Sequence, residues 1–427
     1  MRIALSTTQK LVIGFLAVIL GGGALLALPI SHAPGARLSA IDAWFLSVSA
    51  VCVTGLSPVV IADTLSVFGK IVLAILIQTG GLGYATFAIF LYVLFGGDIP
   101  FRQRDLAQES LNQANSKGII TLVKVVMLSS LIVEAIGTII LAWAFRTQAG
   151  SPREALGLGL FHAISAFNNA GFDLFGDSLM EWHDNLLVNM TVSLLIITGG
   201  IGFVVIADML QAKRWKRFSL HSKIVISTTG VLLVGGMLLI HATSSLSWLE
   251  SWFLSVTSRT AGFNSVDTAT LNRNVLLVVL FLMWIGASPG STGGGIKTTT
   301  FFTLLCGIRG VVTHTEPVGF ERKISDDSLA KATAVAGLSA LALALGIFLL
   351  SLSQHATNLF GLVFEAVSAF ATVGLSTGVT GTLATGGKII LMVLMFIGRL
   401  GPVTIASSLQ KQEARHVHYV PETIIIG

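Results

Sequence analysis

Long apolar stretches recur along this chain of 427 residues and restrict its possible folds more than any other feature. Several approach the roughly 20 residues that a helix needs to cross about 30 Å of hydrocarbon. Only 11% of the residues are charged, against about 25% in a typical soluble domain. Soluble folds are therefore excluded, and we expect an all-α integral membrane protein. The apolar runs lie at residues 11–28, 119–144, 186–209, 224–240, 275–285, 332–352 and 389–397.

The positive charges gather in alternate loops. Lys and Arg are concentrated at residues 102–124, 213–223, 309–331 and beyond 410, whereas the loops between carry few. This asymmetry is the positive-inside pattern of membrane proteins, and it accounts for the net charge of +5 without a nucleic acid. We therefore expect a multi-pass protein of the plasma membrane with both termini in the cytoplasm. The first apolar run is long for a signal peptide and predicts a retained membrane helix.

Four segments share one layout, in which a short stretch with aromatic and serine positions leads to a glycine. The aligned glycines, Gly55, Gly171, Gly262 and Gly374, are 116, 91 and 112 residues apart. These spacings are too long for a solenoid repeat but leave room for two membrane helices and a short re-entrant element. Since each segment lies between two apolar runs, each repeat reads as helix, re-entrant pore loop and helix.

Four such repeats predict about eight transmembrane helices and four short pore helices, arranged pseudo-fourfold around one pore. The expected boundaries are 8–97, 118–211, 222–312 and 329–410, followed by a cytoplasmic tail at 411–427 that we expect to contribute to a dimer contact. Any single glycine-rich match would be weak, because small residues are common where membrane helices pack closely. Four matches in register are much stronger.

The glycine segments suit a monovalent cation. The stretches before the glycines are too short to span a bilayer, and non-helical backbone at membrane depth survives only where it is buried or lines a watery cavity. Half-helices that point their C-terminal ends at one axis favour a cation. Carbonyl oxygens of the turns can replace its hydration shell, and glycine tolerates the backbone conformation that this needs.

The predicted filter segments are 53–57, 168–173, 259–264 and 372–376. The ring that they would form itself lacks the carboxylates typical of divalent-selective pores, and Cys52 and Cys306 lie too far apart in apolar sequence to suggest another metal site. The fourth segment, Thr372 to Ser376, is one step from the potassium-channel TVGYG loop. The expected potassium ligands are Val53, Thr54, Gly55, Leu56, Asn169, Ala170, Gly171, Phe172, Thr260, Ala261, Gly262, Phe263, Thr372, Val373, Gly374 and Leu375.

Residues 287–300 interrupt what should be the second membrane helix of repeat 3. Proline and four glycines remove helix propensity there, and a phosphate-binding loop is excluded because Gly295 is followed by Ile296 rather than Lys297. We predict a flexible gate below the filter, with a simple kink as the alternative. Arg399, roughly mid-helix in repeat 4, is expected to hydrogen-bond to carbonyls of this segment. The predicted gate residues are Pro289, Gly290, Gly293, Gly294, Gly295, Lys297 and Arg399.

These motifs resemble the Trk/Ktr/HKT superfamily of cation transporters over essentially the whole chain, and most closely its Ktr branch, since no extra helices precede the first repeat. The resemblance rests on VTGLS at Val53, NNAGFD at Asn168, RTAGFNS at Arg259, TVGLSTG at Thr372, the glycine-rich break and FIGRLGP at Phe396. It implies potassium uptake stimulated by sodium, a homodimer in the lipid bilayer, and a cytosolic RCK-type regulatory ring that binds the nucleotide. No cofactor is expected on this chain itself.

Two other functions compete with this interpretation. A secondary transporter of a small solute also uses glycine-broken helices, but it predicts two related halves and a polar binding cluster. An intramembrane enzyme needs a constellation of nucleophile and base on facing helices, and the sequence contains none. Glu134 and Glu365 lie in apolar sequence, and we expect each to make a structural hydrogen bond.

Overall fold

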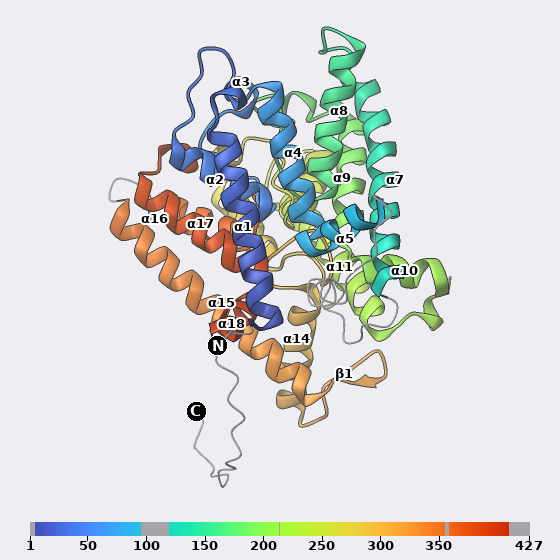
Figure 1. Cartoon of the computed structure of the whole chain (residues 1–427). Helices are drawn as coiled ribbons and strands as arrows, with labels where there is room; N and C mark the ends of the chain where they lie inside the picture. The colour runs from blue at the N-terminus through green and yellow to red at the C-terminus, as the bar shows by residue number, and fades with distance from the viewer. Residues whose placement is uncertain (1–4, 95–118, 213, 355–357, 410–427) are drawn as a thin grey trace.

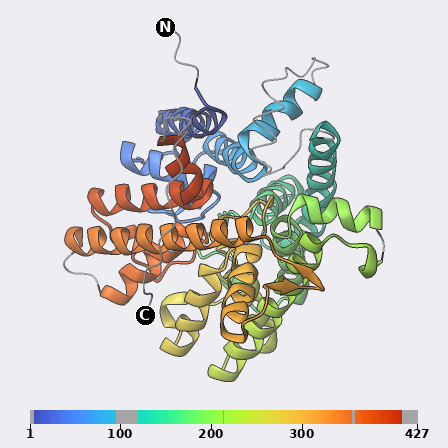
Figure 2. The same cartoon turned by 90° about the horizontal axis from the view of Figure 1, so that it is seen from below.

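The structure, a computed structural model, describes residues 5–94, 119–212, 214–354 and 358–409. Across these ranges the chain is predominantly helical, and its strands are β1 (Val318–Gly319) and β2 (Arg322–Lys323), which pair as a short hairpin. Viewed from below, the chain colours follow one another around a common centre (Figure 2). The predicted all-α fold is confirmed.

Four long helices begin the four repeats. They contain 21, 27, 24 and 28 residues, which at 1.5 Å per residue is enough to cross a bilayer. Serine side chains cap three of their N-termini by accepting a backbone N–H, at Ser6, Ser219 and Ser325. The four are α1 (Thr7–Ala27), α7 (Ile119–Phe145), α11 (Leu220–Thr243) and α15 (Asp326–Ser353).

A shorter helix follows each long one and packs against it (Figure 1). These half-helices have 12, 16, 10 and 12 residues, too few to span. Each starts at a side-chain cap, from Ser39, Ser151, Ser247 and Asn358 respectively, and each ends immediately before a predicted filter segment. They are α2 (Ala40–Val51), α8 (Pro152–Phe167), α12 (Trp248–Thr257) and α16 (Leu359–Phe370).

The second membrane helix is interrupted in all four repeats, which corrects the expectation of a break in repeat 3 alone. In repeats 1, 2 and 4 the chain turns at a glycine with positive φ, namely Gly83, Gly202 and Gly401, a conformation that ends a right-handed helix. The turn bends repeats 2 and 4 by 93°. The helix pairs are α4 (Val67–Leu82) with α5 (Tyr84–Leu94), α9 (Leu186–Gly200) with α10 (Phe203–Ala212), α13 (Arg273–Trp284) with α14 (Thr298–Thr313), and α17 (Thr385–Leu400) with α18 (Pro402–Leu409).

These interruptions reduce the number of spans that can be recognised. Among the described residues, four helices are long and apolar enough to cross a membrane, or up to six if each bent pair is one span, against about eight expected. The remaining short elements lie in connections. They are α3 (Ile61–Thr64), η1 (Pro29–Ser31), η2 (Met180–Trp182), η3 (Trp215–Arg217), η4 (Thr268–Thr270) and η5 (Thr380–Thr382).

Repeat 4 closes the circle against repeat 1. One hydrophobic core joins buried side chains of α1, α2 and α4 to those of α16 and α17. The Lys388 ammonium on α17 lies 2.6 Å from the Asp42 carboxylate on α2, and both side chains are mostly buried. Near the chain ends, the Gln9 side chain donates to the Ser408 carbonyl at 3.0 Å. The four repeats therefore form a closed ring rather than a row.

Candidate functional site

The four glycine segments meet at the centre of the ring. A β-carbon placed on each glycine would collide with a carbonyl oxygen of the next segment in chain order, and the last segment meets the first. No room exists for any side chain here, because real β-carbons do not come within 3.0 Å of such an atom. These distances are 2.5 Å for Gly55 to Ala170, 2.5 Å for Gly171 to Ala261, 2.3 Å for Gly262 to Val373 and 2.1 Å for Gly374 to Thr54.

Each segment alternates its backbone conformation. The glycines have φ between 67° and 94°, and the residue two positions earlier also has positive φ in every repeat. These earlier residues are Val53, Asn169, Thr260 and Thr372, with φ of 50°, 56°, 78° and 52°. A β-branched residue rarely adopts this conformation, so the surrounding structure must impose it. Positive φ was predictable from the sequence at the glycines but not at the residues two positions before them.

The half-helices hold the segments in this conformation. The backbone N–H of Thr54, Ala170 and Val373 each donates at 2.8 Å to the carbonyl of the serine five residues earlier. In repeats 1 and 4 the serine hydroxyl also accepts the glycine N–H at 3.1 Å, from Ser49 to Gly55 and from Ser368 to Gly374. In repeats 1 and 4 one serine, through its carbonyl and its hydroxyl, thus connects the end of the half-helix to the ring backbone.

A cavity of about 330 Å³ lies on the outer side of the ring, lined by all four glycines and by residues that follow the segments. Asp173, at the end of the second segment, is the one carboxylate among the residues that line the cavity. The ring itself offers a cation its backbone carbonyls, supported by the partially negative C-terminal ends of the half-helices. Such an arrangement can replace a hydration shell.

The loop between α13 and α14 lies against the other side of the ring. It covers residues 285–297, so the expected break at 287–300 begins two residues earlier, and residues 298–300 belong to α14. The N–H of Gly294 donates to the Thr372 hydroxyl at 3.0 Å, and the Thr292 hydroxyl lies 3.3 Å from Asn169 Oδ1, to which it donates. A β-carbon on Gly293 would lie 2.2 Å from the Thr260 hydroxyl. The loop therefore contacts segments 2, 3 and 4 directly.

Two cations hold this loop through its carbonyls. Lys297 Nζ lies 2.6 Å from the Gly293 carbonyl oxygen. The Arg399 guanidinium donates to the Thr292 carbonyl and, on α4, to the carbonyls of Gly80 and Gly81. The expected contact between Arg399 and the loop is thus present. Its expected mid-helix position is wrong, because α17 ends at Leu400, where the partially negative C-terminus of a helix favours a cation.

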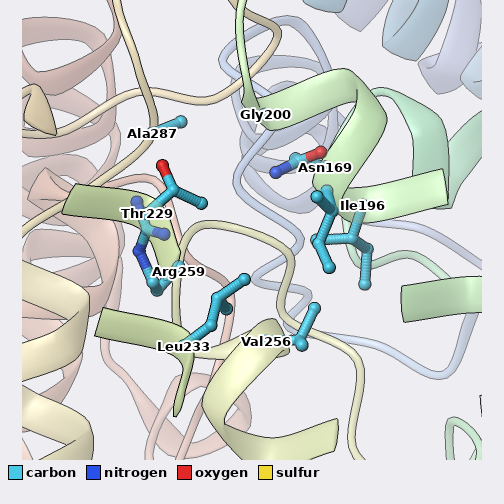
Figure 3. A pocket seen from close by; sticks show the side chains of 9 residues that line it. Asn169, Ile196, Gly200, Thr229, Leu233, Val256, Arg259 and Ala287 are labelled. Atoms are coloured by element: carbon cyan, nitrogen blue, oxygen red, sulfur yellow. The ribbon is translucent and has the colours of Figure 1, made fainter. Parts of the chain in front are cut away.

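Arg259 makes a third contact with the loop. Its position in the RTAGFNS motif did not predict this role. It is 6% exposed, and its Nη2 donates to the carbonyl of Gly286, at the start of the loop, at 3.0 Å. Figure 3 shows its side chain beside Thr229 and across from Asn169 in a cavity of about 20 Å³, enough for one water molecule. The signal in the sequence was an arginine in an otherwise uncharged filter motif.

The two buried carboxylates are hydrogen-bonded, as expected. Glu134 accepts from Gln78 at 3.0 Å and from Asn168 at 3.3 Å, so it connects α7 to α4 and to the end of α8. Glu365 accepts from the Thr380 hydroxyl at 2.8 Å and from the Ser376 hydroxyl.

The chain also matches proteins of known family. A family described as cation transport protein, TrkH, matches residues 6–244 and 231–416. The chain belongs to the TrkH family. Members of this family are ion transporters, so the chain is a multi-pass membrane transporter and not an enzyme.

Relatives of this TrkH-family chain match over almost its full length. The Ktr system potassium uptake protein B of Bacillus subtilis is 42% identical, with 98% of this chain and 96% of that protein covered. The protein of the same name from Vibrio alginolyticus is 37% identical, with 98% of this chain and 94% of that protein covered. The potassium/sodium uptake protein NtpJ of Enterococcus hirae is 36% identical over 100% and 98%. The crystal structure of the potassium transporter TrkH from Vibrio parahaemolyticus shares the fold, with a TM-score of 0.70 at 22% identity over 94% and 86% of the two chains.

Proposed function

We propose that this chain takes up potassium across the plasma membrane through the ring of the four glycine segments. The observation that carries the proposal is the closed set of contacts in which each ring glycine meets the carbonyl of the next segment. A side chain in any of the four places would displace a carbonyl oxygen. The sixteen predicted filter residues are the proposed ligand set, acting chiefly through their backbone, and the four repeats within 8–410 are the units that build it.

The relatives support potassium as the substrate. Proteins 37–42% identical to this chain are named potassium uptake proteins of Ktr systems, and one 36% identical is named for potassium and sodium. Sodium is therefore the proposed second ion, with stimulation of uptake as its role. A transporter of an organic solute is the weaker candidate, because Asp173 is the one charged residue among those that line the cavity, which leaves no charged cluster to bind such a solute.

The loop at 285–297 is the proposed gate. It lies against three filter segments, and Lys297 and Arg399 add positive charge that opposes cation passage. Glycine-rich backbone gains little from helix formation, so two arrangements of the loop can differ by only a few kcal/mol.

The proposed assembly is a homodimer above a cytosolic RCK-type ring that carries the nucleotide, with both chain termini in the cytoplasm. The word "system" in the names of the Ktr relatives implies further subunits. The tail at 411–427, proposed to contribute to the dimer, and Arg102 and Arg104, proposed to contact the ring, lie outside the described residues.

Potassium-limited growth and rubidium uptake in a host without potassium transporters test the proposal, with and without a cytosolic ring subunit. We expect growth and uptake above the empty host, and stronger uptake with the ring. A correctly inserted chain that takes up no rubidium in either condition contradicts the function.

A further inference from the structure

The side chain nine residues before each ring glycine differs between repeats. Repeats 1 and 3 carry Leu46 and Phe253, whereas repeats 2 and 4 carry His162 and Glu365. All four side chains are buried with no exposed surface. Burying a polar side chain costs free energy unless it is hydrogen-bonded, so the partners of the two polar residues indicate what they do.

In repeat 2 the partner is the backbone that leaves the ring. His162 Nε2 accepts the N–H of Leu174, three residues after Gly171, at a distance of 3.4 Å. Its Nδ1 is 2.8 Å from the Leu158 carbonyl, which fixes Nδ1 as the donor, and the imidazole stacks on Phe175 with centroids 4.6 Å apart. The histidine is thus held between its own helix and the outgoing segment.

In repeat 4 the equivalent backbone is also held, more tightly. The Glu365 carboxylate accepts the hydroxyls of Ser376 and Thr380, and the backbone N–H groups of Thr377 and Val379 interact with it too. Thr377 lies three residues after Gly374, as Leu174 lies three residues after Gly171. Two hydroxyl donors and two nearby backbone N–H groups of one short segment therefore surround one carboxylate.

Repeats 1 and 3 do not need such an acceptor. The residue three after Gly55 is Pro58, which has no N–H to satisfy. In repeat 3 the outgoing segment is held by repeat 2, because the Ser178 hydroxyl accepts the Asn264 N–H at 3.0 Å and the Leu179 N–H donates to the Asn264 carbonyl at 2.9 Å. The polar residues thus occur in the two repeats where their side chains bond to the outgoing backbone, whereas repeat 1 has a proline there and repeat 3 is held at Asn264 by repeat 2.

We propose that Glu365 and His162 are positioning residues that fix the outer mouth of the filter and thereby its discrimination between cations. The segments that they hold line the outer cavity, which includes Ser376, Gly378 and Thr380. Loosening such a segment lets the ring carbonyls adapt to a smaller ion, so sodium competes better. This inference rests on the proposed function, since it assumes that the ring is the filter.

Sodium competition against rubidium uptake by the full-length protein tests this inference. Loss of one to two hydrogen bonds near 1 kcal/mol each predicts that Glu365→Ala lowers rubidium-over-sodium discrimination about fivefold or more. Glu365→Gln, which keeps an acceptor oxygen, should fall between Ala and wild type. Thr380→Val removes one donor and should produce a smaller loss. For repeat 2, His162→Phe should lower discrimination and His162→Gln should restore part of it.

Thr382→Val is the matched control, because Thr382 is exposed and its hydroxyl donates only to the nearby Val379 carbonyl. It should keep wild-type discrimination. If Glu365→Ala does not reach the membrane, Thr380→Val is the variant that tests the proposal. Unchanged rubidium-over-sodium discrimination in Thr380→Val then overturns it. If the wild-type protein takes up no rubidium, the proposed function itself is contradicted. If the wild type takes up rubidium but the Glu365 and His162 variants keep wild-type discrimination, only this inference is contradicted.

Discussion

At the scale of single residues, the filter combines one position that the sequence reveals and one that it conceals. A glycine in each repeat was recognisable because only glycine adopts positive φ without a penalty. The residue two positions earlier adopts the same conformation with a valine, an asparagine or a threonine, at a cost of order 1–3 kcal/mol. Nothing in those residue types predicts it, because the strain is imposed by the half-helix and the neighbouring segments. The same holds for Arg259, whose partner Gly286 lies in a loop 27 residues away.

Gly374→Ser is the sharpest test at this scale. Its β-carbon would lie 2.1 Å from the Thr54 carbonyl oxygen, so that carbonyl must move and sodium should compete with rubidium about tenfold better, as a strain near 1.4 kcal/mol would allow. Gly55→Ser should act in the same direction. Competition assays on protein of matched abundance measure the change.

Gly35→Ser provides the control for backbone strain alone. Gly35 also has positive φ, at 81°, but no atom lies within 4 Å of its β-carbon position. Its serine variant should keep wild-type discrimination. If the Gly374, Gly55 and Gly35 variants all discriminate equally between rubidium and sodium, Gly374 and Gly55 are not part of the filter.

At the scale of elements, the interrupted second helices show where sequence reasoning stopped. The break in repeat 3 was predictable from one proline and four glycines within a short stretch. The turns at Gly83, Gly202 and Gly401 were not predicted, although further glycines precede each of them and Pro402 follows the last, because glycine-rich apolar sequence is common where membrane helices pack closely. Tertiary contacts decide them: the N–H of Phe203, just after one turn, donates to the Gly290 carbonyl of the loop at 2.9 Å. The loop thus depends on a bend in another repeat.

Gly294→Ala tests whether the loop is a gate. The new methyl group would lie 2.3 Å from the Thr372 hydroxyl, which now accepts the Gly294 N–H. We expect loss of that hydrogen bond to release the loop and raise rubidium flux about fivefold, and deletion of residues 290–295 to raise it further with weaker dependence on the ring. Tracer flux into vesicles measures both.

Gly337→Ala on α15 is the matched control, because no atom lies within 4 Å of its β-carbon position and alanine favours a helix. It should conduct like the wild type. If the loop variants insert correctly but conduct no faster and remain fully regulated, the loop is a simple kink and not a gate.

At the scale of the whole molecule, the β1–β2 hairpin lies close in sequence to the loop proposed as the gate. It follows α14 directly, and Phe320 at its tip stacks on Phe302 of that helix, with centroids 6.0 Å apart, and meets Trp215 of η3. Force applied to the hairpin can therefore reach α14 and the loop before it. The aromatic contact between the hairpin and α14 could not be predicted from the sequence, because it depends on how the chain folds.

Charge reversal of Arg322 and Lys323 on β2 should weaken binding of the ring subunit. Glu316 hydrogen-bonds to Lys323 and raises its pKa, so the lysine stays charged at neutral pH. We expect about tenfold weaker binding at physiological salt, since two exposed charges that would attract the ring become repulsive. Pull-down or calorimetric titration of the ring measures it. Unchanged binding in the double variant would mean that docking uses other contacts.

Deletion of residues 419–427 tests the proposed role of the tail in the dimer. This stretch, outside the described residues, contains the apolar run Ile424–Ile426, which would be poorly placed in water. Native mass spectrometry of the truncated protein should show a larger monomer fraction. A fully retained dimer would rule out that role.

The contact between Lys388 and Asp42 has a consequence for biosynthesis. The two residues are 346 positions apart, and ribosomes extend a chain by about 5–20 residues per second, so Asp42 waits roughly 20–70 s for its partner. During that interval repeat 1 has already been synthesised, but the surface that it will bury against repeat 4 has no partner. Inserting the chain into a membrane is thus a different event from assembling the pore. The second event must follow release of the last helices, and any factor that shields that surface of repeat 1 would act in that interval.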